Sequence, residues 1–142
     1  MEYRKQAHVT YCADYHLVFV TKYRRKVLKD GMGGYLKESM KGIVRIFPEV
    51  EILEQNTDED HIHQLVSIPP KHSVAEVVKY LKGKSAYVMR RKFPSLDQVY
   101  YGADGIWSDG YFVSTVGVNE ETVRRYIERQ GLEDSGQVRL VL

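Results

Sequence analysis

Residues 15–22 read Tyr-His-Leu-Val-Phe-Val-Thr-Lys. β-Branched, aromatic and aliphatic side chains follow one another there, and neither glycine nor proline interrupts them. This composition is typical of a β-strand. The stretch therefore predicts the first strand of a sheet, and the elements that follow it along the chain decide the fold.

Residues 34–47 carry apolar side chains at spacings of three and four, which predicts a helix lying on that sheet. Pro48 ends this helix. Further strands are expected at 50–55 and 61–68, because an acidic turn at 57–60 separates them and a pair of prolines closes the second one.

Ser73 is expected to cap a second helix, because Glu76 stands three residues later in the reciprocal capping-box pattern. An apolar stripe continues from there to Phe93, so this helix is long. Its other face carries the cations Lys79, Lys82, Lys84, Arg90, Arg91 and Lys92. One amphipathic element is thus expected to bind the core on one side and to present positive charge on the other.

The remaining expected elements are a strand at 111–116, a last helix that Asn119 caps and Gly131 stops, and a tail strand at 138–142. The order strand, helix, strand, strand, helix, strand, helix predicts an α+β fold with a ferredoxin-like, RRM-like antiparallel sheet. We expect residues 1–142 to form one domain, with helices on one face of the sheet and an added C-terminal helix.

The composition is that of one soluble globular domain, since 43% of the 142 residues are hydrophobic and 28% are charged. Cys12 is the single cysteine and no secretory pattern is seen, so we expect a reducing, cytoplasmic location. Apolar runs of four or five residues fall far short of the roughly 20 that a spanning helix requires, which predicts no membrane partner. The glycine-rich run at 31–34 lacks the Lys-Ser/Thr of a phosphate loop, so no nucleotide cofactor is expected.

The net charge is only +2, but the basic side chains are concentrated in two blocks of the sequence. Residues 1–50 carry ten basic and five acidic side chains, and residues 71–92 carry seven and one. Two interpretations are open: the blocks form a phosphate-binding surface, or they are solvated faces.

His61 and His63 stand two apart in a predicted strand, so both imidazoles project from the same face. They form a platform for two metal bonds, a pair of half-buried hydrogen-bonding groups, or a pair of surface side chains without a role. The other histidines, His8, His16 and His72, do not stand beside a second candidate at strand or helix spacing, so none of them is expected to be a ligand.

Tyr126 and Gln130 lie four apart on the last predicted helix and therefore share a face. Such a pair is common by chance. A helical tyrosine is also more often a packing residue than a nucleophile, so the spacing alone does not establish a catalytic site.

Four strings of sequence, taken together, favour a functional role for these residues. They are Tyr-His-Leu-Val-Phe-Val-Thr-Lys-Tyr-Arg-Arg-Lys-Val-Leu at 15–28, Asp-His-Ile-His at 60–63, Trp-Ser-Asp-Gly-Tyr-Phe-Val-Ser-Thr-Val-Gly at 107–117, and Val-x-x-Tyr-Ile-x-x-Gln at 123–130. In this order, and over nearly the whole chain, they resemble the single-tyrosine (HUH, Y1) transposases of the IS200/IS605 type.

The resemblance implies a site and a reaction. Tyr126 would be the nucleophile, which makes the added helix the catalytic one. His61, His63 and Gln130 would ligate a divalent metal, Mg²⁺ or Mn²⁺. Single-stranded DNA would be cleaved and rejoined at the ends of an insertion element through a 5′-phosphotyrosine intermediate.

The attack requires a positive field, because the ordinary pKa of a tyrosine is about 10 and its hydroxyl must lose a proton. The neutral ligand set leaves most of the charge of the metal available for this purpose. Arg124, Arg125 and Arg129 are expected to add to the field, since they surround the tyrosine in the sequence.

The resemblance also implies partners. These are single-stranded DNA with a hairpin near each element end, and a second copy of the chain in a homodimer, because two cleavages require two nucleophiles. Whether the site is built within one chain or between two stays open. Cations with an aromatic residue among them suit contacts with the DNA backbone and stacking on bases. The residues expected to contact DNA are Lys22, Tyr23, Arg24, Arg25, Lys26, Lys79, Lys82, Arg90 and Arg91.

Two other functions are open. A ferredoxin-like sheet with exposed aromatics and basic rims also suits a module that binds single-stranded nucleic acid without cutting it, although His61 and His63 have no role there. The second is a metal-dependent hydrolase with a water nucleophile, in which Tyr126 only packs. A covalent adduct between protein and DNA separates the transposase from both.

Overall fold

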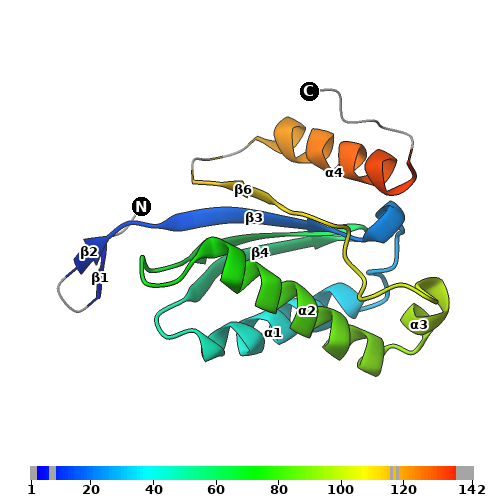
Figure 1. Cartoon of the computed structure of the whole chain (residues 1–142), viewed down its shortest axis with the longest axis horizontal. Coiled ribbons are helices and arrows are strands. Elements are labelled where there is room, and N and C mark those ends of the chain that lie inside the picture. The colour runs from blue at the N-terminus through cyan, green and yellow to red at the C-terminus, as the bar shows by residue number, and fades with distance from the viewer. Residues whose placement is uncertain (1–2, 7–8, 116, 118, 137–142) are drawn as a thin grey trace.

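The computed structural model describes residues 3–6, 9–115, 117 and 119–136. Its centre is a four-stranded antiparallel sheet in the order β4-β5-β3-β6 (Figure 1). The strands are β3 (Asp14–Val20), β4 (Glu51–Asp58), β5 (His61–Ser67) and β6 (Phe112–Ser114). β3 therefore lies inside the sheet, between β5 and β6.

Helices cover both faces of this sheet (Figure 1). α1 (Met32–Ile43) and α2 (Val74–Lys92) lie side by side on one face, and α4 (Glu120–Asp134) lies on the other. The strand order and the two crossovers are those of a ferredoxin-like α+β fold, which confirms the predicted fold class. Among the described residues, no helix is both long enough and apolar enough to cross a membrane.

β3 is buried on both of its faces. Leu17 and Phe19 point into the main core, which α1 and α2 share with the sheet. Val18 and Val20 point to the opposite face and pack against α4. Successive side chains of a strand alternate between the two faces, so a strand that is covered on both sides needs the unbroken apolar run found here.

Two predicted helix starts are confirmed. The Ser73 hydroxyl accepts a hydrogen bond from the backbone N–H of Glu76 at 3.0 Å, and Asn119 Oδ1 accepts one from the N–H of Thr122 at 2.8 Å. Each cap satisfies a backbone donor that has no partner within the first helical turn.

The predicted helix stop at Gly131 is wrong. α4 continues through it to Asp134, because Gly131 keeps a helical backbone rather than the positive φ of a terminating glycine. The strand expected at 111–116 is shorter than predicted, since β6 ends at Ser114. The tail strand expected at 138–142 lies outside the described residues.

Three small features are missing from the sequence prediction. They are a hairpin of β1 (Arg4–Gln6) and β2 (Val9–Tyr11), a turn of 3₁₀ helix (Lys22–Arg24), and the short helix α3 (Ser95–Val99). These elements are three to five residues long, which is too short for a hydrophobic period to be recognised.

Replacing Ser73 with alanine tests the cap of α2. We expect Ser73→Ala to lower the free energy of unfolding by about 1 kcal/mol in urea titrations, because the Glu76 N–H loses its acceptor. Ser39→Ala is the matched control, since Ser39 lies inside α1 and its hydroxyl donates to the carbonyl of Tyr35. Equal losses of stability in the two variants would contradict the capping role.

Candidate active site

His61 and His63 lie on the sheet face that carries α4. In the strand register they are directly opposite Val20 and Val18 of β3. Ile62, which stands between them, is fully buried in the main core on the other face. The two partly buried imidazoles therefore share one face, as the strand period predicts.

A carboxylate fixes the ring of His61. The Nδ1 atom of His61 is 2.8 Å from Asp60 Oδ1, and Arg24 Nε donates to Asp60 Oδ2 at 3.1 Å. The hydrogen bond with His61, reinforced by Arg24, lowers the pKa of Asp60. The ionised carboxylate then accepts the Nδ1 proton, and Nε2 keeps the lone pair that a metal ligand requires.

His63 contacts another histidine. Its Nε2 lies 3.1 Å from Nδ1 of His16 on β3, and the two ring centroids are 5.3 Å apart. Burial lowers the pKa of His63, and the neighbouring His16 and His61 lower it further. The imidazole is therefore neutral at pH 7, which is the protonation state that binds metals.

α4 packs on the same face of the sheet as the imidazoles. Val123 and Ile127 form a small buried cluster with Val18 and Val20. A cavity of about 360 Å³ lies next to this contact, lined by His61, by its neighbours in the turn before β5 and by α4. The helix therefore docks on the sheet face that carries the imidazoles, next to His61 of its own chain.

Tyr126 lies on α4 and is partly buried. Its ring centroid is 5.6 Å from that of Phe112 on β6. Burial, with smaller contributions from Glu133 and Asp134, raises the pKa of Tyr126 to about 12. The hydroxyl is thus protonated at neutral pH in this docked arrangement, and it must lose its proton during any attack.

Gln130 follows one turn later and is 8% exposed. Its Nε2 donates to Asp134 Oδ1 at 3.5 Å, so the amide oxygen, which is the atom that binds cations, takes no part in this bond. In the described part of the chain, neither Tyr126 nor Gln130 forms a hydrogen bond with an imidazole of β5. Nor do the described residues include a group of three or more His, Cys, Asp or Glu side chains placed to hold a metal ion.

The turn after β3 joins the imidazole platform to α4. Tyr23 and Arg24 have φ values of 59° and 55°, in the left-handed region. The Tyr23 N–H donates to Asp134 Oδ2 at 2.8 Å. A Cβ placed on Gly131 would stand only 3.0 Å from Arg24 Cβ. Arg24 therefore contacts both α4 and the Asp60 carboxylate.

Residues 9–130 match the protein family described as "Transposase IS200 like". The chain belongs to the family of IS200-like transposases. This membership agrees with the family that the four sequence strings resemble, and it makes the chain a DNA-processing enzyme.

Relatives and solved structures agree with the family. The transposase is 39% identical over 131 residues to the transposase for insertion sequence element IS200 of Salmonella typhimurium, covering 90% of this chain and 83% of that one. It superposes on the crystal structure of a transposase from Deinococcus radiodurans R1 with a TM-score of 0.78 and 34% identity, covering 89% and 97% of the two chains. A REP-associated tyrosine transposase bound to a REP hairpin shares the fold, with a TM-score of 0.54, 16% identity and coverages of 97% and 76%.

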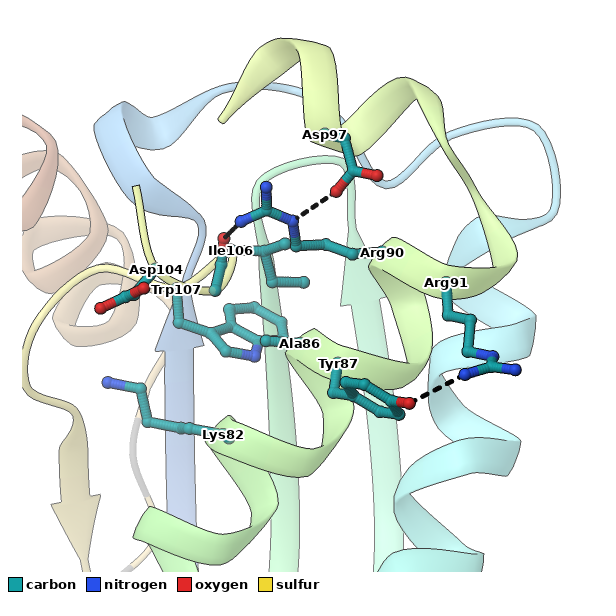
Figure 2. Close-up of a pocket in the computed structure, with 11 residues that line it drawn as sticks. Lys82, Ala86, Tyr87, Arg90, Arg91, Asp97, Asp104, Ile106 and Trp107 are labelled. Carbon is teal, nitrogen blue, oxygen red and sulfur yellow. Dashed lines mark hydrogen bonds and ion pairs between the residues drawn. The ribbon is translucent and has the colours of Figure 1, made fainter. Parts of the chain in front are cut away.

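Several of the predicted DNA contacts of the transposase have hydrogen-bond partners within the protein, and Lys82 and Arg90 are the partly buried examples on α2. Lys82 Nζ donates to the carbonyls of Ser108 and Gly110, both at 2.7 Å, and burial lowers the pKa of Lys82. Arg90 binds Asp97 at 2.8 Å and also donates to carbonyls of the loop after α3 (Figure 2). The hydrogen bonds of these cations hold that loop against α2. Their contact with DNA stays a prediction.

A cavity of about 690 Å³ opens beside α2 (Figure 2). Trp107 contributes to its lining, is only 5% exposed, and donates from Nε1 to Ser85 at 3.0 Å. Tyr87 is 56% exposed, and its hydroxyl accepts a hydrogen bond from Arg91 at 2.9 Å. The charged ends of Lys84 and Arg91 lie 5.6 and 6.0 Å from the centroid of the Tyr87 ring. An exposed aromatic ring flanked by cations is a surface on which nucleic-acid bases stack.

The predicted contacts at 22–26 form a second basic segment. The Arg25 guanidinium lies 5.2 Å from the ring centroid of Tyr23 and 5.7 Å from that of Tyr100. Lys26 lines the cavity beside α4. Of all predicted DNA contacts, the exposed ones are Tyr23, Arg24, Arg25, Lys26, Lys79 and Arg91, and the partly buried ones are Lys22, Lys82 and Arg90.

The positive field expected from α4 is balanced by neighbouring carboxylates. Arg124 and Arg125 both pair with Glu121, the second at 3.1 Å. Arg129 pairs with Glu133 at 3.2 Å. The helix therefore adds little net positive charge near its tyrosine.

Three residues that contact the imidazoles or support them are not predicted in that role from the sequence. Asp60 is quoted only as part of a string, although its position directly before His61 is the signal for a carboxylate partner. Arg24 is assigned to DNA alone, and no local spacing connects it with Asp60. The signal for His16 is the pairing of β3 with β5, which becomes visible only once the register is known.

Replacing Gly131 with alanine tests the docking of α4. Gly42→Ala in α1 is the matched control, because its new Cβ would meet no atom within 4 Å. We expect this control to raise the free energy of unfolding by about 0.5–1 kcal/mol, since alanine loses less backbone entropy than glycine.

We expect Gly131→Ala to lower the free energy of unfolding and to speed amide hydrogen exchange in α4, because Arg24, held by its left-handed backbone and its bond to Asp60, would have to shift to admit the new Cβ. Urea titration and exchange measurements on both variants provide the comparison. An equal gain of stability in both would refute the close approach.

Proposed function

We propose that this transposase cleaves and rejoins single-stranded DNA at the ends of an insertion element through a 5′-phosphotyrosine intermediate. One observation carries the proposal: α4, which bears Tyr126, docks on the sheet face that presents His61 and His63. The proposed nucleophile and the proposed metal platform therefore lie on one side of the sheet. Membership of the IS200-like family supports a reaction on DNA.

The donor set fits a divalent cation. His61 is held through Nδ1 and presents Nε2, His63 is neutral, and Gln130 has an amide oxygen. We assign these residues as ligands of Mg²⁺ or Mn²⁺, with the remaining coordination positions left for substrate and water. A cation held there would polarise a non-bridging oxygen of the phosphodiester.

Tyr126 is the proposed nucleophile. Its Oη forms a bond to phosphorus while the bond between phosphorus and the 3′ oxygen breaks, which yields a 5′-phosphotyrosine and a free 3′-hydroxyl. The phenol loses one proton and the leaving oxygen gains one, so the step is balanced in protons. Because the phosphotyrosine conserves the energy of the phosphodiester, attack by a 3′-hydroxyl in the reverse direction rejoins strands without ATP.

The proposed substrate is single-stranded DNA with hairpins near the element ends. The cations of the chain support this, since Lys79 and Arg91 are exposed on α2 and Tyr87 is accessible between Lys84 and Arg91. Lys82 and Arg90 support the same surface by holding the adjacent loop. The residues that we propose for DNA binding are Lys22, Tyr23, Arg24, Arg25, Lys26, Lys79, Lys82, Arg90 and Arg91.

The proposed assembly is a homodimer that works in the cytoplasm. Excision of an element and joining of its flanks require two cleavages, whereas each chain supplies one tyrosine in this position. The proposed reaction needs neither a nucleotide cofactor nor a membrane partner.

Tyr126→Phe should abolish the covalent adduct, because it removes the hydroxyl and keeps the ring that packs on Phe112. A single-stranded substrate with a fluorophore at its 3′ end reports the adduct on a denaturing gel, since the fragment with the 5′-phosphate stays on the protein. Tyr101→Phe is the control and should form the adduct normally, because Tyr101 is 91% exposed.

Three results would overturn this proposal in different ways. An adduct on Tyr126→Phe would move the nucleophile to another tyrosine. Metal-dependent cleavage by the unmodified chain without an adduct would identify a hydrolase with a water nucleophile. Binding without any cleavage would identify a nucleic-acid-binding module.

Neutralising Lys79 and Arg91 tests the α2 surface. The double variant Lys79→Gln with Arg91→Gln should weaken binding of a DNA hairpin and lower the slope of log K against log salt by about one unit for each phosphate that the variant no longer binds. Lys41→Gln with Lys71→Gln removes the same charge, but these lysines are already paired with Glu38 and Glu49. Fluorescence anisotropy over a range of salt concentrations gives the slopes. If the Lys79→Gln, Arg91→Gln variant has the same slope as the unmodified chain, the cations of α2 form a solvated face that does not bind DNA.

A further inference from the structure

We infer that His16 is a positioning residue for His63: a direct contact between the two imidazoles holds the ring of the proposed metal ligand. This inference rests on the metal site proposed above. It assigns to His16 a role outside the ligand set itself.

The contact is fixed by strand pairing. The Nε2 atom of His63 lies 3.1 Å from Nδ1 of His16, within hydrogen-bond distance. His16 is paired with Leu65 of β5, and its neighbour on the same face, Val18, is paired with His63. The two histidines are thus diagonal neighbours on adjacent strands, where side chains of this length meet. Their relative position depends on the register of β3 and β5 rather than on a loop.

The chemistry of the contact matches the support found at His61. A metal-binding imidazole is oriented when one ring nitrogen is hydrogen-bonded and the other is left for the ion. Asp60 provides such a bond for His61 through Nδ1. His16 provides it for His63 through Nε2, and Nδ1 of His63 takes no part in that contact.

The direction of the hydrogen bond follows from this role. When the Nε2–H of His63 donates to Nδ1 of His16, the Nδ1 atom of His63 keeps its lone pair for an ion. In the opposite direction, Nε2 of His63 would accept the hydrogen bond and the proton of the neutral ring would lie on Nδ1. His63 would then have no free lone pair for a metal ion. The proposed role therefore requires His16 to accept through Nδ1, with its own ring proton on Nε2.

Titration of the whole chain with Mn²⁺ in the absence of DNA tests the inference, because it measures metal binding independently of cleavage. Electron paramagnetic resonance reports free Mn²⁺ at each step. His16→Leu removes the acceptor, and we expect the Kd for Mn²⁺ to rise about 10- to 100-fold. His72→Asn is the control and should bind like the unmodified chain, because His72 contacts the carbonyl of Pro48 away from the site.

Two amide variants separate positioning from packing. In His16→Asn the side-chain amide reaches the place of the imidazole Nδ1, so its oxygen accepts from His63 and the affinity should stay close to that of the unmodified chain. In His16→Gln the amide lies one bond further out, near the place of Nε2, and the affinity should fall as in His16→Leu. The Asn and Gln pair also provides the test if His16→Leu does not fold in thermal melts.

The outcomes distinguish this inference from the proposed function. Unchanged Mn²⁺ affinity in His16→Leu or His16→Gln would overturn the role of His16 and leave the metal site intact. Weak binding in His16→Asn would also overturn it, since the imidazole itself would then be required. Mn²⁺ binding that His61→Ala does not weaken would overturn the proposed metal site, and the inference with it.

Discussion

The burial of β3 on both faces is the constraint on which the rest of the structure depends. Leu17 and Phe19 complete the core under α1 and α2, while Val18 and Val20 form the floor on which α4 rests. With only one apolar face, this strand would leave α4 without a docking surface, and the tyrosine would not lie on the side of the imidazoles. Because neighbouring side chains serve opposite faces, the stability of the fold and the assembly of the site do not compete for the same residues.

The two faces differ in how firmly they hold their helices. α1 and α2 share the large main core with the sheet, whereas α4 rests on a cluster with four buried members and on hydrogen bonds from the Tyr23 N–H and the Ser108 hydroxyl to Asp134. Elements with few buried apolar contacts open at the lowest cost in free energy. Burial is the main reason that the pKa of Tyr126 is about 12, so a helix that loosens from Phe112 moves this pKa back toward its ordinary value. The docked helix thus keeps the Tyr126 hydroxyl protonated at neutral pH.

Much of the fold could be predicted because its signals are local. The apolar run of β3 and the caps at Ser73 and Asn119 each depend on residues within a few positions of one another. Gly131 shows the limit of such signals. A glycine is used either for a positive φ or for the absence of a side chain, and its letter does not say which use applies. Here the reason is the close approach of Arg24, a residue more than a hundred positions earlier in the chain, and the helix continues.

The candidate site also combines features with a local sequence signal and features that depend on long-range contacts. His61 and His63 are recognisable because the strand period acts over two residues, but the support from His16 exists only through the register of β3 with β5. Whether a cation is free to bind a ligand also depends on long-range contacts. The sequence predicts Lys82 to be a free cation of an amphipathic helix, yet two carbonyls of a distant loop take up its ammonium group. A sequence therefore shows how many cations a face carries, and the tertiary contacts decide which of them remain free to bind a phosphate.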